Sequence, residues 1–223
     1  MIIQLTDVTK GTGLAADVPP LTATITDGAP SVIAVETDER PMLIAMLIGG
    51  RLRADSGVIT IDGRENYDTL RAAIAIVDTP FVSEPPAGIS LATVVREELS
   101  FSDRSNSRRA ISDFLAAHGL AEYAKVPVRS LPPTMRIRLF CELALLRKGI
   151  RCLVVTSPER HGAAPSEWYS VLSSISDRGI AVVILTDVLT GETLLGLGAQ
   201  NAQAPANSAL ESDEPTTSKV TRS

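Results

Sequence analysis

Residues 151–187, with the sequence RCLVVTSPERHGAAPSEWYSVLSSISDRGIAVVILTD, contain the pattern that decides the fold. The apolar, β-branched run at 151–155 is typical of a strand buried on both faces, and 180–185 is a second run of this kind. The segment 166–177 between them has the apolar spacing of a helix. A strand, a helix and another strand in this order predict a βαβ unit and therefore a parallel sheet.

The alternation of strands and helices continues toward the N-terminus. Further strands are expected at 2–8, 21–26, 31–35, 58–61 and 74–77, and further helices at 42–48, 91–99, 108–118 and 134–147. The stretch at about 80–130 carries only helical patterns, so it reads as a helical insertion. From residue 199 the composition shifts to Ala, Gln, Asn, Ser, Thr and Pro, which predicts a single domain at 1–198 and a disordered tail at 199–223.

Composition excludes several classes of protein. The chain has 223 residues, 44% of them hydrophobic, which is enough for one globular core. The formal net charge of −5 and the 4% of aromatic residues argue against a nucleic-acid partner, since phosphate binding needs basic patches and base stacking needs aromatic side chains.

The two cysteines, Cys141 and Cys152, are expected to be reduced thiols in the core. His118 and His161 lack neighbouring ligands in the sequence, so no metal site is expected.

Membrane insertion and secretion are also not expected. The longest apolar run, 42–48, is far shorter than the roughly 20 residues that a spanning helix needs. The N-terminus MIIQLTDVTK lacks a basic region followed by an apolar run, so it does not resemble a signal peptide. We therefore expect a cytoplasmic protein whose contact with a membrane is made through a partner.

Six segments resemble, in order, parts of the nucleotide-binding domain of ABC transporters. They are LTDVT at 5–9, RLRADSGVITIDGRE at 51–65, the stretch 70–77 followed by PFVSEPPAGISLATVVREEL at 80–99, LPPTMRIRLFCELALL at 131–146, RCLVVTSPE at 151–159 and GIAVVILTD at 179–187. The resemblance covers about residues 1–195. It implies an α/β fold of the P-loop NTPase type, with the ABC ATPase sheet, a small antiparallel β part and a helical subdomain at about 80–130.

The segment that matches the phosphate-binding loop of this family is VETDERPM at 35–42. Such a loop needs glycines, a Lys that neutralises the phosphates and a hydroxyl that binds Mg²⁺. Here Pro41 stands in the place of the Lys, Met42 in the place of the hydroxyl, and there is no glycine. The acidic side chains give the segment a net charge of −2, which repels a triphosphate. The altered positions are Glu36, Asp38, Glu39, Arg40, Pro41 and Met42.

The other positions that the resemblance assigns to catalysis are altered in the same way. Thr156 and Ser157 take the places of the Mg²⁺-orienting Asp and the catalytic Glu, and a hydroxyl cannot replace a carboxylate in either role. Asp187 stands at the switch His of the H-loop, and Thr79 stands at the Gln of the Q-loop. Pro132 and Pro133 replace part of the signature motif, where they remove backbone N–H donors.

These changes predict a non-catalytic, ABC-ATPase-like subunit or adaptor without a bound cofactor. The resemblance implies an integral-membrane, transporter-type partner at the cytoplasmic face, which would contact Thr79, Pro80 and Phe81. It also allows a homodimer or a heterodimer with another ABC-ATPase-like chain. Because both halves of each shared ATP site are altered, a regulatory or scaffold role is favoured over a role as an asymmetric motor.

Two alternatives stay open from the sequence. In the first, the chain is a divergent ATP-binding protein that still binds Mg-ATP and hydrolyses it slowly, with Asp187 or Asp78 as substitute carboxylates. In the second, it is a free soluble domain without any transporter. Simpler interpretations also exist for single residues. The acidic segment can be a solvated loop or a binding site for a basic partner. Pro132 and Pro133 can simply start a helix, and Asp187 can be a residue at the end of a strand.

Overall fold

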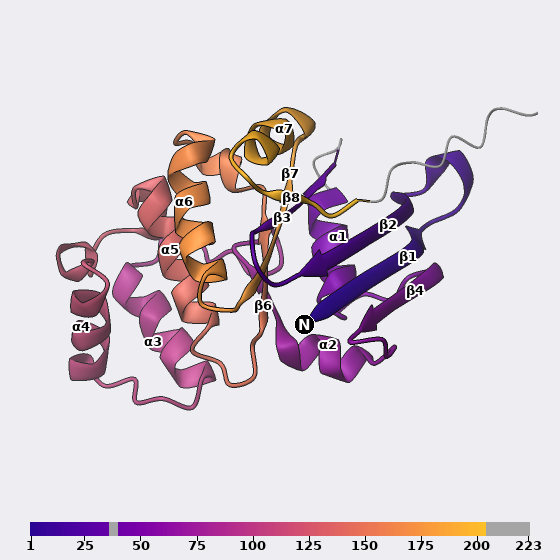
Figure 1. Cartoon of the computed structure of the whole chain (residues 1–223). Helices are drawn as coiled ribbons and strands as arrows, with labels where there is room; N and C mark the ends of the chain where they lie inside the picture. The colour runs from indigo at the N-terminus through magenta and orange to yellow at the C-terminus, as the bar shows by residue number, and fades with distance from the viewer. Residues whose placement is uncertain (36–39, 204–223) are drawn as a thin grey trace, which may run out of the picture.

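The computed structural model describes residues 1–35 and 40–203, which form two sheets and their covering helices (Figure 1). The parallel sheet has the order β5-β6-β7-β3-β8, and the antiparallel sheet has the order β2-β1-β4. The strands are β1 Ile2–Lys10, β2 Val18–Thr26, β3 Ser31–Ala34, β4 Ser56–Ile61, β5 Ile74–Val77, β6 Cys152–Thr156, β7 Ala181–Thr186 and β8 Gln200–Asn201. The α/β class, with a parallel sheet and a small antiparallel one, is confirmed.

Seven α-helices and four short 3₁₀ helices connect the strands in the described ranges. The α-helices are α1 Arg40–Ile48, α2 Tyr67–Ala73, α3 Leu91–Phe101, α4 Arg108–Ala117, α5 Pro133–Ala144, α6 Pro165–Ser176 and α7 Val188–Gly196. The 3₁₀ helices are η1 Gly13–Ala15, η2 Ala121–Tyr123, η3 Val128–Ser130 and η4 Pro158–His161. The stretch at about 80–130, expected to be helical, holds α3, α4, η2 and η3.

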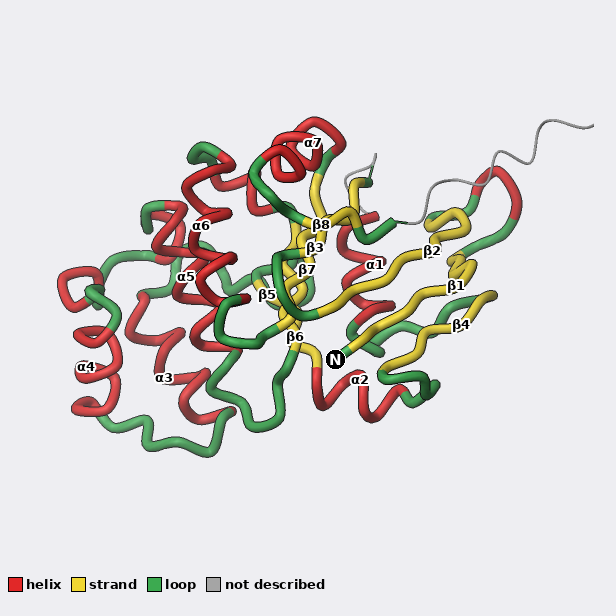
Figure 2. Tube along the Cα trace, viewed as in Figure 1, coloured by secondary structure: helices red, strands yellow, loops and turns green. Residues whose placement is uncertain are grey.

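The parallel strands are buried on both faces because each face meets a different core. In β6, Leu153 and Val155 belong to the core shared with α3–α6, whereas Cys152 and Val154 belong to the core shared with α1 and the antiparallel sheet. This arrangement explains why the strands are continuous apolar runs without a polar face. Figure 2 shows α3–α6 on one side of the parallel sheet and the antiparallel strands on the other.

Helix α1 lies in the core between the two sheets. Its sequence RPMLIAMLI is apolar on every side, and Ile44, Ala45, Leu47 and Ile48 are buried there. A helix without a polar face is stable only when its surroundings are apolar on all sides. The sequence prediction of a helix at 42–48 is confirmed, and its first turn begins two residues earlier.

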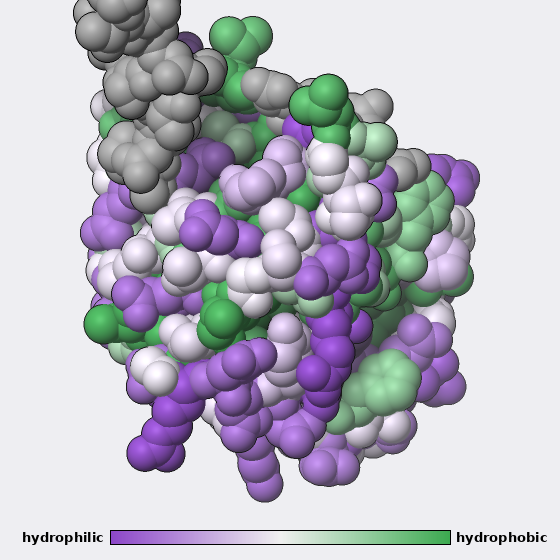
Figure 3. Space-filling view, turned by 90° about the vertical axis from the view of Figure 1, so that its right-hand side faces the viewer, coloured by the Kyte–Doolittle hydropathy of each residue, from purple (hydrophilic) through white to green (hydrophobic). Residues whose placement is uncertain are grey.

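The antiparallel sheet presents one face to solvent. Strand β1 pairs Ile3 with Ile25 of β2 and with Ile61 of β4, and these side chains point into the core. Figure 3 shows the molecule from the side of this sheet, where hydrophilic side chains predominate in the lower part of the view and apolar ones are scattered. The alternation along β1 is the expected result of one buried and one solvated face.

Two described elements differ from the sequence predictions near the C-terminus. Residues 188–196 form α7, which was not predicted, and residues 200–201 form β8, where a disordered tail was predicted from residue 199. β8 pairs in parallel with β3, and Thr24 N donates to Ala202 O at 2.8 Å. Backbone pairing of this kind is independent of side-chain pattern, so a polar Gln-Asn pair gives no strand signal. The rest of the predicted tail, 204–223, lies outside the described residues.

Helix α2 was also not predicted, and it is short but well capped. The Asn66 side chain accepts a hydrogen bond from Thr69 N at 3.0 Å, as an N-cap residue does.

Among the described residues, no helix combines the length and the apolar character that crossing a membrane requires.

Candidate functional site

The carboxyl ends of β5, β6 and β7 bring the sequence-predicted site residues to one edge of the parallel sheet. Thr79 follows β5, Ser157 follows β6, and Asp187 follows β7, while Thr156 ends β6 itself. In open α/β sheets, ligands bind in the crevice beyond this edge. The structure therefore places these residues in the region where a site is expected.

Thr79 and Thr156 are paired with each other. Their Oγ1 atoms lie 2.7 Å apart, and both residues are buried. The resemblance assigns Thr156 to the place of the metal-orienting carboxylate, but its hydroxyl already has a partner inside the protein. Thr79 was also predicted to contact a membrane partner. Its side chain is fully buried, so Thr79 offers no surface to a partner in this structure.

Ser157 adopts a left-handed backbone conformation with φ 46°, which is unusual for a residue with a side chain. Its N–H donates to Leu185 O at 2.7 Å, and this bond fixes the start of η4 against β7. The turn of η4 then carries Glu159, not Ser157, toward the end of β7.

Glu159 is a site residue that the sequence reasoning missed. Its Oε2 accepts a hydrogen bond from Thr186 Oγ1 at 2.8 Å, where Thr186 is fully buried. Burial raises the pKa of Glu159 above its ordinary range, and the nearby charge of Asp187 acts in the same direction. A carboxylate with a raised pKa at the carboxyl edge of a parallel sheet is a recognised kind of functional candidate. The place of Glu159 in the site follows only from the path of η4, which brings its side chain to Thr186 at the end of β7.

Asp187 serves as the N-cap of α7. Its side chain accepts hydrogen bonds from Thr190 N at 2.9 Å and from Thr190 Oγ1 at 2.6 Å. The small burial of Asp187 raises its pKa, but the hydrogen bonds from Thr190 outweigh this effect, and the pKa lies below its usual range. The interpretation of Asp187 as a strand-end residue is confirmed.

Asp78 lies at the centre of a buried ionic cluster. Arg136 Nε donates to Asp78 Oδ2 at 2.8 Å and Arg136 Nη2 donates to Asp78 Oδ1 at 2.7 Å. Arg160 Nη2 donates to the backbone O of Asp78 at 2.6 Å, and His161 Nε2 lies 2.9 Å from Asp78 Oδ2. Burial alone would raise the pKa of Asp78, but contact with His161, Arg136 and Arg160 holds the pKa below its usual range.

The same cluster contains three groups that could in principle hold a cation. Asp78, Glu84 and His161 each offer one ligand atom, and these atoms lie within 4.8 Å of one another. However, Arg136 and Arg160 both contact Asp78 and Glu84, so the two carboxylates are already balanced by two guanidinium groups. A divalent ion would be repelled by both, and the cluster is therefore better suited to internal ion pairs than to a metal.

The start of α5 offers few backbone donors. Pro132 is the N-cap and Pro133 is the first helical residue, and neither has an N–H. The interpretation of these prolines as a helix start is confirmed. Helix N-termini usually bind anions through free N–H groups, so this one is poorly suited to hold a phosphate.

A pocket lies beside the amino end of α1. Arg40 Nε donates to Asp17 O at 3.0 Å, Pro41 is buried, and Met42 is partly buried. A pocket of about 240 Å³ lies beside them, lined by Val18, Pro19, Pro20, Leu21, Ala34, Val35, Arg40, Ile44 and Gln203. Glu36, Asp38 and Glu39, which were predicted to form an acidic loop, lie outside the described residues.

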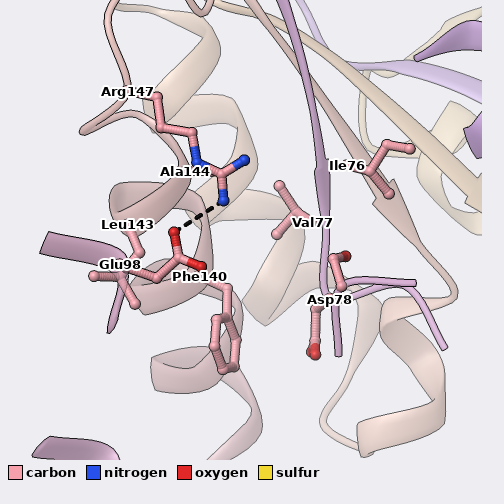
Figure 4. A pocket seen from close by; sticks show the side chains of 9 residues that line it. Ile76, Val77, Asp78, Glu98, Phe140, Leu143, Ala144 and Arg147 are labelled. Atoms are coloured by element: carbon pink, nitrogen blue, oxygen red, sulfur yellow. Dashed lines mark hydrogen bonds and ion pairs between the residues drawn. The ribbon is translucent and has the colours of Figure 1, made fainter. Parts of the chain in front are cut away.

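A narrow groove runs between α3, α5 and the end of β5 (Figure 4). Its volume is only about 30 Å³, and its walls combine apolar side chains, such as Phe140 and Leu143, with the ion pair between Glu98 and Arg147. Ser83 also lines it, from the turn that follows Asp78. Phe81, two residues earlier, is 97% exposed, so it is accessible to the partner that the resemblance implies.

Both cysteines are buried and free, as expected for core thiols. Burial raises the pKa of Cys152 to about 12 and also raises that of Cys141. Neither thiol is therefore a candidate nucleophile.

Comparison with solved structures identifies the fold. A dimeric bacterial ABC transporter cassette matches with TM-score 0.64 and 18% identity over 85% of this chain and 90% of its own. A component of an ABC transporter complex of Clostridium perfringens matches with TM-score 0.60 and 16% identity over 86% of this chain and 80% of its own. A nucleotide-free ATP-binding cassette gives 0.63 and 14%, over 86% of this chain and 84% of its own. No protein-family model matches the sequence, and no curated protein does.

Proposed function

We propose that this chain is a non-catalytic subunit or adaptor that binds a membrane transporter-type partner at the cytoplasmic face. The chain has the fold of ABC transporter ATP-binding cassettes. Within that fold, the observation that carries the proposal is the pairing of Thr79 with Thr156 at 2.7 Å, at the place where the resemblance expects the groups that bind Mg²⁺. Two hydroxyl groups that satisfy each other in a buried position offer no charge to a metal ion.

The carboxylates near this pair support the same conclusion. Asp78 is held by two guanidinium groups, and Asp187 caps α7 through Thr190. Both were considered as substitutes for the missing catalytic acids, and both are engaged within the protein. Releasing either one would leave a buried Arg or a helix end without its partner, which is costly.

A membrane partner is proposed from the surface next to the site. Phe81 is an exposed aromatic side chain beside Pro80, and the groove between α3 and α5 lies nearby, with Ser83 of the same turn in its wall. An exposed aromatic residue next to a groove lined partly by apolar side chains is typical of a protein-binding surface. We propose that a cytoplasmic helix of the partner covers Phe81 and this groove. A dimer with an ABC-ATPase-like chain is compatible with the same role.

Native purification tests the partner. The full chain, isolated in mild detergent from the cell that produces it, is expected to bring down a membrane protein with several spanning helices. Recovery of the chain alone under these conditions would contradict the proposed function and would favour the free soluble domain.

A second candidate function, weak binding and hydrolysis of nucleotide, is favoured by one observation. Glu159 is a carboxylate at the carboxyl edge whose pKa is raised by burial and which accepts a hydrogen bond from the Thr186 hydroxyl. Such a group could act as a general base. ATP and Mg²⁺ would be the cofactors under this alternative only.

Thermal unfolding with Mg-ATP separates the two functions. A ligand at one hundred times its dissociation constant adds about 2.7 kcal/mol to the free energy of unfolding, which gives a clear shift of the melting temperature. We expect no shift in millimolar Mg-ATP and no phosphate release above a protein-free blank. A shift that depends on concentration, together with phosphate release, would overturn the non-catalytic assignment.

A further inference from the structure

Gln203, the last described residue, is fixed to both sheets. The N–H of Ala34 in β3 donates to Gln203 Oε1 at 3.0 Å, and Gln203 Nε2 donates to Ala34 O at 3.2 Å. The backbone of Gln203 also forms an antiparallel bridge with Ala23 of β2. The side-chain amide therefore pairs with β3 as a strand residue would, and residues 204–223 continue from a fixed position.

That position lies in the wall of the pocket beside the amino end of α1. Gln203 lines this pocket of about 240 Å³ together with Val18, Leu21, Val35 and Ile44. These four apolar residues are at most 8% exposed, so they form an apolar floor. The volume is smaller than the roughly 300–1,000 Å³ that is typical of sites for drug-sized ligands. A pocket of this size and character suits a small apolar group, such as a single side chain.

The rim of the pocket limits how an occupant can bind. Pro19 and Pro20 are exposed on β2, an edge strand of the antiparallel sheet, and they have no N–H with which to pair a further strand. Arg40 is the one charged side chain in the described wall, and its Nε donates to Asp17 O at 3.0 Å. The pocket is therefore suited to an apolar side chain that has a carboxylate next to it.

Residues 204–223 contain two large aliphatic side chains, Leu210 and Val220. Leu210 is followed directly by Glu211, whereas Val220 is preceded by Lys219. Leu210 is seven residues from Gln203, which allows a reach of up to about 25 Å, so it can return to the pocket. Val220 is 17 residues away, and its effective concentration at the pocket is roughly fourfold lower, since this quantity falls as about the −3/2 power of linker length. Both charge and linker length favour Leu210.

We propose that Leu210 docks into this pocket of its own chain, with the Glu211 carboxylate beside Arg40. Val35 and Arg40 belong to the segment that matches the phosphate-binding loop, so the docked segment competes with any ligand that enters beside that loop. Residues 204–223 are then an intramolecular, autoinhibitory ligand of the domain. This role goes beyond the proposed function and does not depend on a membrane partner.

Nuclear magnetic resonance of the full chain tests the contact directly. With labelled Ile, Leu and Val methyl groups, we expect nuclear Overhauser effects between the methyls of Leu210 and those of Val18, Val35 or Ile44. Val220 is the internal control, and its methyls should show no such effects with the pocket. Absence of the Leu210 effects, or effects from Val220 in their place, would overturn the proposal.

One pair of variants measures the apolar anchor. Leu210→Ser should lower the ratio of docked to undocked segment at least about tenfold, because the burial of a leucine side chain is lost. The methyl shifts of Val18 and Ile44 report this ratio, and the methyl shifts of the rest of the domain should stay unchanged. Val220→Ser should leave the ratio as it is in the wild type. Equal effects of L210S and V220S, or no effect of L210S, would overturn the role of Leu210.

A second pair of variants measures the charge contact. Glu211→Gln should lower the same ratio roughly twofold to fivefold at low salt, as loss of an exposed ion pair does. Glu214→Gln removes an equal charge three residues further on and should have no such effect. Equal effects of E211Q and E214Q would overturn the contact between Glu211 and Arg40.

Dilution of the sample separates docking within one chain from docking between two copies. The ratio of docked to undocked segment should not change with protein concentration, because the pocket and Leu210 belong to the same chain. A ratio that falls on dilution would place the segment of a second copy in the pocket and would overturn the intramolecular assignment.

Discussion

Arg136 and Asp78, 58 residues apart in the sequence, face each other through two hydrogen bonds of 2.8 and 2.7 Å, and both side chains are at most 6% exposed. This pair joins α5 to the end of β5, so it connects the helical region with the parallel sheet. It is a bidentate ion pair, in which the planar guanidinium donates to both carboxylate oxygens. The remainder of the ionic cluster is arranged around it.

Arg136→Met should destabilise the fold strongly. Methionine keeps much of the side-chain volume but leaves the buried Asp78 without its main partner, and removal of one member of a buried pair costs about 3–5 kcal/mol. Urea unfolding followed by circular dichroism measures the loss. Arg138→Met, on the exposed side of the same helix, is the matched control and should change stability by no more than about 0.5 kcal/mol. Equal stability of the two variants would contradict the role assigned to Arg136.

The same pair should make the fold sensitive to acid. The contacts with His161, Arg136 and Arg160 hold the pKa of Asp78 below its ordinary range in the folded state, against the effect of burial. A carboxyl in the unfolded chain titrates at roughly 3.9, so the unfolded state takes up this proton first. The stabilisation from Asp78 is complete above about pH 5 and is lost as the pH falls below about 4 toward the folded-state pKa.

Asp78→Asn tests this pH dependence. The variant should be less stable than the wild type at pH 7, and the difference in the free energy of unfolding should shrink as the pH is lowered from 5 to 3. Unfolding in urea at fixed pH values gives this difference directly. A gap between the two proteins that stays constant over this range would show that Asp78 does not titrate with a lowered pKa.

The sequence predicted β3, β5, β6 and β7 of the parallel sheet well because these strands are continuous runs of apolar, mostly β-branched residues. It did not predict α7, since Gly191 and Gly196 weaken the helical pattern. Helix α7 packs closely on β3 at Gly191, where a Cβ would lie 3.4 Å from the Cβ of Ala34, an ordinary contact distance. The capping of α7 by Asp187, with Thr190 as donor three residues later, was the local signal that could have identified it.

The candidate site was predictable only in part. Thr79, Thr156, Ser157 and Asp187 come together because they end or follow neighbouring parallel strands. The ionic cluster could not be predicted in this way, since Arg136 and Arg160 reach Asp78 and Glu84 through tertiary packing. Glu159 was missed because the left-handed backbone conformation of Ser157 redirects the chain after β6. A serine at this position does not predict such a conformation from the sequence.

Thr79 and Thr156 should show strong coupling in a double-mutant cycle. Thr156→Val leaves the buried hydroxyl of Thr79 without its main partner, and an unsatisfied buried polar group costs about 1–3 kcal/mol. When Thr79→Val is added, both sites become apolar and similar in shape, so the double variant should be more stable than the sum of the single changes predicts. Equilibrium unfolding of the four proteins gives the coupling energy, and a value near zero would argue against the 2.7 Å contact between the hydroxyls.

Glu159→Gln should distinguish the structural role of this residue from a catalytic one. Burial raises the pKa of Glu159, so the folded state disfavours the ionised form of this side chain. The contribution of Glu159 to the free energy of unfolding is therefore greatest at low pH, and it falls as the pH rises through the folded-state pKa. The neutral amide avoids this loss and can still accept the hydrogen bond from Thr186. The variant should therefore have a higher melting temperature than the wild type at pH 7, and the difference should be smaller at pH 4. If Glu159 instead activates water, wild-type protein will release phosphate from Mg-ATP and the variant will not; a non-catalytic chain gives the same blank-level release for both.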